Sequence, residues 1–393
     1  MKKLYETQHL LKSIKADDLG NIYNHVTHKA VEWAVGGQLH YANGLLENVW
    51  AFYSADYRNV RRELEGLQIM WELSGNFPSG IPFPFRKVEE IEEENWIDIR
   101  IVSPFKGEDV YAILSQLETS IQKADGYNYG TLSAGAAILA LENGLIPEGK
   151  KFIQDWGEGY MKDYHYMVSH LMRNRKTSTL LLQGLLLPVF NLTAEKCRAE
   201  YEELSAALKE RKEGGRKLMY GDQSWNSLLK NLSLLAIKDD PELFAEDLIL
   251  SKWLGSDPAS EASILAAEER IGKKLPADYR EFLKASNGFP RHSNTSPSLL
   301  PVEEIGWLSD LDNGLAELVE QMLEWGGEKY AGLSKDCLLV SGLNEEEQIL
   351  LFPTKEGNWE CWYLVIPGGC GETWYPGFRY CMEDRLFFLE WVS

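Results

Sequence analysis

Residues 264–288 read Ile264-Leu-Ala-Ala-Glu-Glu-Arg-Ile-Gly-Lys-Lys-Leu-Pro-Ala-Asp-Tyr-Arg-Glu-Phe-Leu-Lys-Ala-Ser-Asn-Gly288 and predict two short helices joined by a sharp turn. Gly272 is expected to end the first helix, because glycine tolerates the left-handed backbone conformation of a helix C-cap. Leu275-Pro276 is expected to open the second helix, since proline fits the first turn. Asn287-Gly288 is a stop signal that ends it.

The second of these helices is predicted to be buried along one side. Tyr279, Phe282 and Leu283 recur at the i, i+3, i+4 spacing of a helical face that packs against a core. None of these residue types in this spacing indicates catalysis. The stretch therefore predicts a structural signature rather than a catalytic site.

The signature string, Leu-Pro-x-Asp-Tyr-x-x-Phe-Leu-x-x-Ser-Asn-Gly, resembles that of the SUKH superfamily. The resemblance continues through Leu299–Trp307 and through the alternating segments Leu338–Val340, Ile349–Pro353 and Trp359–Val365, and it ends in Leu386–Trp391. It covers roughly residues 250–393. The residues that carry it as structural positions are Leu275, Pro276, Tyr279, Phe282, Leu283, Asn287, Gly288, Trp307 and Trp359.

The resemblance implies an α+β fold with a mainly antiparallel sheet. Members of the superfamily are mostly bacterial immunity proteins that bind and neutralise toxins, often nucleases or deaminases. A minority are regulators, including a regulator of fungal cell-wall synthesis. The superfamily is a binding scaffold with no known shared catalytic residues, so the resemblance implies no cofactor.

The remainder of the chain predicts a second domain. Its 393 residues are long for one domain. Helical patterns dominate residues 1–215, although 96–102 alternate and are either a strand or an irregular crossing segment. Gly214-Gly215 favours a linker. We therefore expect an all-α domain of unknown family over 1–215 and a SUKH-like domain over 216–393, with lead-in helices at 223–254.

Charge is uneven along the chain. The net charge is −20 overall, and residues 216–393 hold 16 basic and 30 acidic side chains, a net −14. An acidic field repels nucleic acid and attracts basic partners. Acidity that serves only solubility is the alternative. The acidity therefore predicts no nucleic-acid partner. The sequence also predicts no membrane partner, since its most apolar run is too short to span a bilayer.

Motifs for chemistry are weak. The five cysteines have no metal-ligand spacing, which favours reduced thiols and a cytoplasmic protein. His25 and His28 lie three residues apart on a helix but have no third ligand of assured geometry, so cap, surface or core histidines are the favoured interpretation. We predict no catalytic residue, no metal and no enzyme activity.

Two features are candidates for partner binding. Glu345, Glu346 and Glu347 lie between two predicted strands, and a hairpin tip with three carboxylates would be an exposed anionic knob that contacts a basic partner. A solubilising turn that protects a strand edge is the alternative. Trp374 and Tyr375 lie in turn-like sequence and are candidate exposed anchors.

These observations predict a non-enzymatic binding protein. The favoured hypothesis is an immunity protein that occludes a basic protein toxin stoichiometrically. The alternative is a regulatory or scaffold protein that uses the same domain to bind an endogenous partner. The sequence leaves the oligomeric state open.

Overall fold

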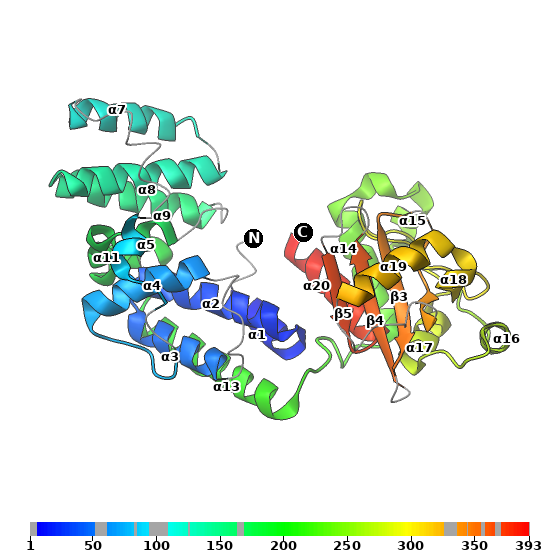
Figure 1. The fold of residues 1–393 in the computed structure, drawn as a ribbon. Coiled ribbons are helices and arrows are strands. Elements are labelled where there is room, and N and C mark those ends of the chain that lie inside the picture. Colours follow the sequence, from blue (N-terminus) through cyan, green and yellow to red (C-terminus); the bar gives the residue numbers. More distant parts are fainter. Residues whose placement is uncertain are drawn as a thin grey trace. The chain divides into compact units, whose positions relative to one another are not determined.

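The computed structural model of the chain describes residues 6–51, 61–81, 85–93, 109–124, 126–162, 169–325, 336–343, 345–354, 358–365 and 371–392. The chain divides into two compact units, Met1–Lys217 and Leu218–Ser393. Each unit has its own hydrophobic core, and Figure 1 shows the helices and strands of both. The predicted fold class, a helical N-terminal region followed by an α+β region, is confirmed.

The described residues of the first unit form helices only. They are α1 (Thr7–Ala16), α2 (Leu19–Val35), α3 (Leu39–Trp50), α4 (Arg61–Ser74), α5 (Val88–Glu93), α7 (Val110–Ile121), α8 (Gly126–Glu142), α9 (Ile146–Lys162), α10 (Ser169–Met172), α11 (Arg175–Leu182), α12 (Leu187–Phe190) and α13 (Ala194–Gly214). The alternating segment 96–102 lies outside the described residues.

The helices of the first unit bury one large apolar core. Trp33, Trp71 and Trp156 are fully buried within it. Local sequence sets several helix ends: the Thr193 side chain accepts a hydrogen bond from Lys196 N–H, and α13 ends where Gly215 has a φ of 71°. Such end groups satisfy backbone atoms that the helix itself leaves without partners.

The second unit begins with α14 (Trp225–Asp239) and continues through a sheet framed by helices. Its further elements are the 3-10 helix η4 (Pro241–Leu243), α15 (Glu246–Ser251), α16 (Glu261–Ile271), α17 (Ala277–Ala285), β1 (Gly306–Trp307), α18 (Leu308–Leu311), α19 (Asn313–Trp325), β2 (Leu338–Leu339), β3 (Glu347–Pro353), β4 (Trp359–Val365), β5 (Gly371–Tyr375) and α20 (Phe378–Val392).

The five strands form one antiparallel sheet in chain order, β1-β2-β3-β4-β5. Side chains alternate between its faces. Leu350, Trp362 and Leu364 pack with residues of α19 on one face. On the other face, Tyr363 of β4 lies against α20, whose Arg385 guanidinium is 4.2 Å from the tyrosine ring. Helices therefore cover both faces of the sheet (Figure 1).

Helices α16 and α17 follow the predicted boundaries closely. Gly272 ends α16 with a φ of 72°, the left-handed conformation that glycine adopts without strain. Pro276 stands at the N-cap of α17. The buried side of α17 contributes Tyr279 and Phe282 to an aromatic cluster with Trp225 and Phe378, which joins α17 to α14 and α20.

Candidate functional site

The apolar signature residues lie in the core of the second unit. Tyr279, Phe282 and Leu283 have no exposed surface, and Leu275 is 5% exposed. Pro276 is buried at the start of α17. These positions stabilise the fold and leave recognition to neighbouring side chains.

The Asn287-Gly288 pair fixes the turn that follows α17. The side-chain Oδ1 of Asn287 accepts a hydrogen bond from Val302 N–H at 2.8 Å, and its Nδ2 donates to the Glu303 carboxylate at 3.0 Å. Gly288 has a φ of 90°, and a Cβ there would lie 2.8 Å from the Leu299 carbonyl oxygen. A glycine is therefore required at this point by both backbone conformation and space.

The two signature tryptophans are half-buried. The indole N–H of Trp307 donates to the Ile271 carbonyl at the end of α16, at 3.0 Å. The Lys273 ammonium lies 5.5 Å from the ring centroid of Trp359, within range of a cation–π contact. Trp307 thus holds the C-terminal end of α16, whereas Trp359 is half-buried at the start of β4.

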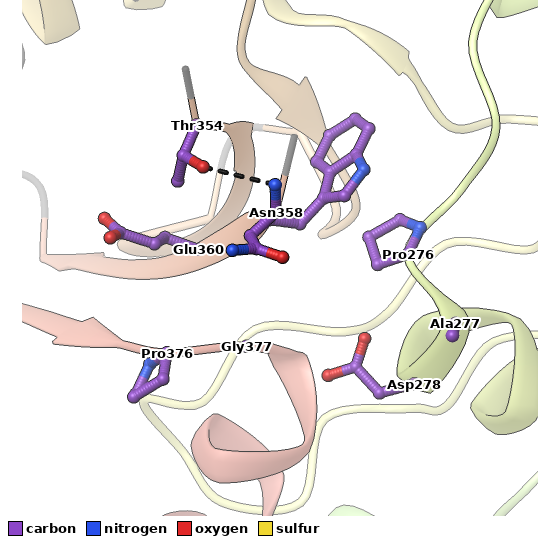
Figure 2. A pocket seen from close by; sticks show the side chains of 9 residues that line it. Pro276, Ala277, Asp278, Thr354, Asn358, Glu360, Pro376 and Gly377 are labelled. Carbon is purple, nitrogen blue, oxygen red and sulfur yellow. Dashed lines mark hydrogen bonds between the residues drawn. The ribbon is translucent and has the colours of Figure 1, made fainter. Parts of the chain in front are cut away.

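An open cleft of about 570 Å³, named here the Trp359 cleft, lies beside the first turn of α17. Three segments meet there: the start of α17, the ends of β3 and β4, and the turn between β5 and α20. In Figure 2, Thr354, Asn358 and Glu360 line one wall, and Asp278, Pro376 and Gly377 lie opposite. The lining residues are Pro276, Ala277, Asp278, Thr354, Asn358, Trp359, Glu360, Pro376 and Gly377.

Asp278 joins two helices at the base of this cleft. Its Oδ1 accepts a hydrogen bond from Tyr279 N–H, and its Oδ2 accepts one from Arg379 N–H in the first turn of α20, both at 2.9 Å. A carboxylate at a helix start satisfies backbone donors and complements the positive end of the helix dipole. Asp278 therefore caps α20 from a distant part of the sequence.

A second hollow of about 500 Å³, named here the Trp225 hollow, lies on the other side of the same turn. Asp278 and Ala277 border both spaces. The Arg379 guanidinium lies 4.5 Å from the Trp225 ring and donates to Glu383. The other residues of the hollow are Gln223, Ser224, Asn226, Glu281, Lys284 and Ala285.

The expected anionic knob does not form as three exposed carboxylates. Glu345 turns inward, and its carboxylate accepts hydrogen bonds from the backbone and side chain of Ser298, each at 2.7 Å. Glu347 is half-buried at the start of β3, and burial raises the pKa of its carboxyl group. Glu346 alone of the three is exposed.

The expected exposed anchors are also placed differently. Trp374 lies in β5 and stacks on Trp362, with ring centroids 4.8 Å apart, next to Phe352. Tyr375 is 2% exposed, and its hydroxyl donates to Asp384 at 2.6 Å. The flanking glycines and proline suggested a turn, but pairing of β5 with β4 makes this segment a strand.

Sequence reasoning missed most of the cleft. Asp278 stands inside the signature string, and its position before a buried tyrosine is a usable signal for a helix-start carboxylate. Thr354, Asn358 and Glu360 carry no such signal, because their distance from α17 depends on how β3 and β4 pair.

His25 and His28, the pair three residues apart in the sequence, are half-buried on α2. His25 Nδ1 lies 3.1 Å from Ser13 Oγ, and burial lowers the pKa of His25 to about 4. Burial also lowers the pKa of His28. Across the described ranges, no group of three or more His, Cys, Asp and Glu side chains has a geometry suited to a metal ion.

The comparisons with known proteins concern the second unit. No curated protein and no solved structure matches the chain. Within the part of the chain that the structure describes, no helix has the length and apolar character to cross a membrane. The first unit has no family assignment. Residues 258–379, which include the signature and the Trp359 cleft, match the SMI1 / KNR4 family (SUKH-1), which confirms the resemblance predicted for this region.

Proposed function

We propose that this chain is an immunity protein that binds a cognate bacterial toxin through its SUKH-like unit and blocks it stoichiometrically. The observation that carries the proposal is the SUKH-1 match over residues 258–379, because this family indicates an immunity or regulatory role based on protein binding. Neutralisation requires only a stable complex, with no turnover and no cofactor. The family is generally non-enzymatic.

Charge supports a basic partner. Residues 216–393 carry a net −14. An acidic surface raises the association rate of a basic protein through long-range attraction, and this attraction weakens as salt screens it. Fast capture suits a protein whose target is harmful while free. A toxin that acts on nucleic acid, such as a nuclease or deaminase, has a basic surface for that purpose.

Reduced thiols support a cytoplasmic site of action. Cys197, Cys337, Cys361 and Cys381 are buried and form no disulfide. Cysteines that form no disulfide are typical of proteins in reducing compartments.

The proposal is tested by recovering the partner and measuring what binding does to it. The chain is purified from its native host, the bound protein is identified, and the complex is rebuilt from the two purified proteins. We expect a complex of fixed stoichiometry by light scattering, growth arrest when the partner is expressed alone, and rescue when this chain is co-expressed.

The alternative function, regulation or scaffolding, gives a different result in the same assay. A partner that is harmless when expressed alone, or that keeps its activity in the complex, would identify the chain as a regulatory binding protein and contradict the immunity proposal. Residues 1–217 are tested beside it by comparing the full chain with a variant that lacks them.

A further inference from the structure

We infer that the two units move relative to one another about Leu218 and Met219, while the residues on either side of this pair are fixed to their own unit. The inference goes beyond the proposed function, since it applies to an immunity protein and to a regulator alike. It is carried by hydrogen bonds that hold both flanks of the pair, and by the boundary between the units, which falls between Lys217 and Leu218. The segment 215–224, which joins α13 to α14, is therefore a hinge with fixed flanks rather than a free linker.

The first flank is fixed to the C-terminal end of α1. Lys217 N–H donates a hydrogen bond to the Lys15 carbonyl at 3.0 Å, and the Arg216 guanidinium donates to the Ala16 carbonyl. The last carbonyls of a helix have no partner within the helix, and cations are favourable near the negative end of its dipole. Residues 216–217 therefore complete the end of α1 and belong to the first unit.

The glycine pair that favours a linker in the sequence lies before this flank and is fixed as well. Gly214 is the last residue of α13, and Gly215 N–H donates to the Arg211 carbonyl at 3.0 Å, which closes the helix end. The buried Arg211 side chain donates from its Nη2 to the Asp17 carbonyl at 3.0 Å, directly after α1. The end of α13 is thus bonded to the end of α1 before the hinge begins.

The second flank is a turn that α20 holds. Gln223 N–H donates to the Tyr220 carbonyl at 2.9 Å, which closes the turn. Arg379 donates from its Nη2 to the carbonyls of Tyr220 and Gln223, at 3.3 Å and 3.0 Å. Glu383 accepts Tyr220 N–H at 3.0 Å through Oε2 and Arg379 Nε–H at 2.7 Å through Oε1. One buried ion pair, named here the Arg379–Glu383 latch, therefore fixes both ends of the turn.

The Tyr220 side chain adds a further connection to α20. Its hydroxyl donates to the Glu390 carboxylate at 2.6 Å, and the residue is 6% exposed. Hydrogen bonds to an ionised acceptor are shorter and stronger than those between neutral groups. Burial and the bond to Glu390 raise the pKa of Tyr220 above its usual range, so the hydroxyl keeps its proton and stays a donor.

Fixed flanks shorten the part of the connection that is free to move. If the ten residues 215–224 were free, they would span about 35 Å in extended form. The two residues between Lys217 and Tyr220 span about 7 Å. A connection this short confines the motion of the units to a few backbone dihedrals, whereas release of the turn would lengthen it severalfold. The Arg379–Glu383 latch therefore limits how freely the units move.

The test measures hydrogen exchange of single backbone amides by NMR in the full chain. The amides of Gly215, Lys217, Tyr220 and Gln223 donate hydrogen bonds in the structure. We expect each to exchange at least about a hundredfold more slowly than in an unstructured peptide, because exchange then requires local opening. Fast exchange of Gly215 and Lys217 would place the moving part at the glycine pair, and fast exchange of Tyr220 and Gln223 would place it within the turn. Either result would overturn the inference.

Two variants then release one flank each. Tyr220→Phe removes the hydroxyl contact with Glu390, and we expect about tenfold faster exchange of the amides at positions 220 and 223 with no change at Lys217. Arg216→Ala removes the guanidinium contact with α1, and we expect about fivefold faster exchange at Lys217 with no change in the turn. The responses should be independent because the flanks belong to different units.

Matched controls separate these local effects from a general loss of stability. Tyr279→Phe removes a buried hydroxyl that has no hydrogen-bond partner among the described residues, and Lys209→Ala removes an exposed cation of α13. Both should leave the four amides unchanged. The Leu232 amide in α14 reports opening of the second unit as a whole. If Tyr220→Phe accelerated exchange at Leu232 as much as at Gln223, or if each variant changed both flanks, the flanks would not be fixed independently and the inference would be overturned.

The double variant, Arg216→Ala with Tyr220→Phe, tests the consequence for motion. Relaxation of ¹⁵N-labelled amides within each unit gives the rotational correlation time of that unit. Because release of both flanks lengthens the free connection, we expect both correlation times to fall below those of the parent. Correlation times equal to the parent's, together with faster exchange at both flanks, would show that the flanks do not limit the motion of the units and would overturn the inference.

Discussion

The two spaces beside the first turn of α17 have one wall in common and differ in the charged side chains that line them. Asp278 borders both, and each has a half-buried tryptophan. In the Trp225 hollow, Lys284 and Arg379 accompany the carboxylates, and Arg379 lies against the tryptophan. In the Trp359 cleft no lysine or arginine lines the described surface. Each tryptophan has a cation against its ring, Arg379 at Trp225 and Lys273 at Trp359, so the two spaces differ in the charged side chains that line them and not in whether a cation lies on the tryptophan.

The largest effect on stability is expected from substitutions in the aromatic cluster that lies beneath both spaces. Tyr279→Ala or Phe282→Ala should lower the free energy of unfolding by about 3–5 kcal/mol, because both side chains are fully buried and their loss leaves a cavity. Urea unfolding monitored by tryptophan fluorescence measures this. Because Tyr279 and Phe282 anchor α17, whose first turn forms the wall common to the two spaces, either substitution should also disorder that wall.

Tyr279→Phe is the matched control for that change. The Tyr279 hydroxyl is buried and has no hydrogen-bond partner among the described residues. Removing it keeps the ring and eliminates an unsatisfied polar group, so stability should stay within about 1 kcal/mol of the parent or rise. A loss as large as that of Tyr279→Ala would indicate a bonded hydroxyl and contradict this description of the cluster.

An intermediate effect on stability is expected from Asp278, whose carboxylate borders both spaces. Asp278→Ala should lower stability by about 1–2 kcal/mol, because Arg379 N–H at the start of α20 loses its acceptor. Asp278→Asn keeps an acceptor oxygen and should lose less. Hydrogen exchange of the Arg379 amide reports the cap directly, and unchanged protection in Asp278→Ala would show that Asp278 does not cap α20.

The sequence predicted those parts of the second unit that depend on neighbouring residues. Gly272 and Pro276 mark helix ends through their own backbone preferences, so α16 and α17 were predictable. Trp374 was not, because glycine and proline beside it suggest a turn, whereas its environment is set by pairing with Trp362. Local preference is a weak guide where a strand partner decides the conformation.

The Trp359 cleft was beyond sequence reasoning for the same reason. Asp278 and Glu360 are far apart along the chain. They line one cleft because the start of β4 and the start of α20 both lie beside the start of α17. The expectation that Glu345, Glu346 and Glu347 are all exposed was wrong for a contact over a shorter distance, whereas their role in partner binding stays a prediction. A run of three carboxylates indicates a solvated tip, but it does not reveal that Ser298 presents donors to the first of them.

Glu345 and Glu346 are adjacent in the sequence but differ in environment, because the first is half-buried and hydrogen-bonded and the second is exposed. Glu345→Ala should lower stability by about 1–2 kcal/mol, since Ser298 N–H and its hydroxyl lose their acceptor in a half-buried setting. Ser298→Ala removes the hydroxyl contact alone and should lower stability by less. Thermal unfolding of the three proteins checks the order, and equal melting temperatures would make the inward turn of Glu345 energetically unimportant.

The smallest effect on stability is expected from Glu346, whose side chain is exposed and lines neither the Trp359 cleft nor the Trp225 hollow. Glu346→Lys should change stability by less than about 0.5 kcal/mol, because exposed charges contribute little. Its effect should be kinetic: association with a basic partner should slow by about two- to threefold at low salt and converge with the parent at high salt, since a charge at the rim acts on encounter. Stopped-flow association with the purified partner measures both. An association rate that is independent of salt, and equal in Glu346→Lys and the parent, would show that the acidity of residues 216–393 has no role in the capture of a partner.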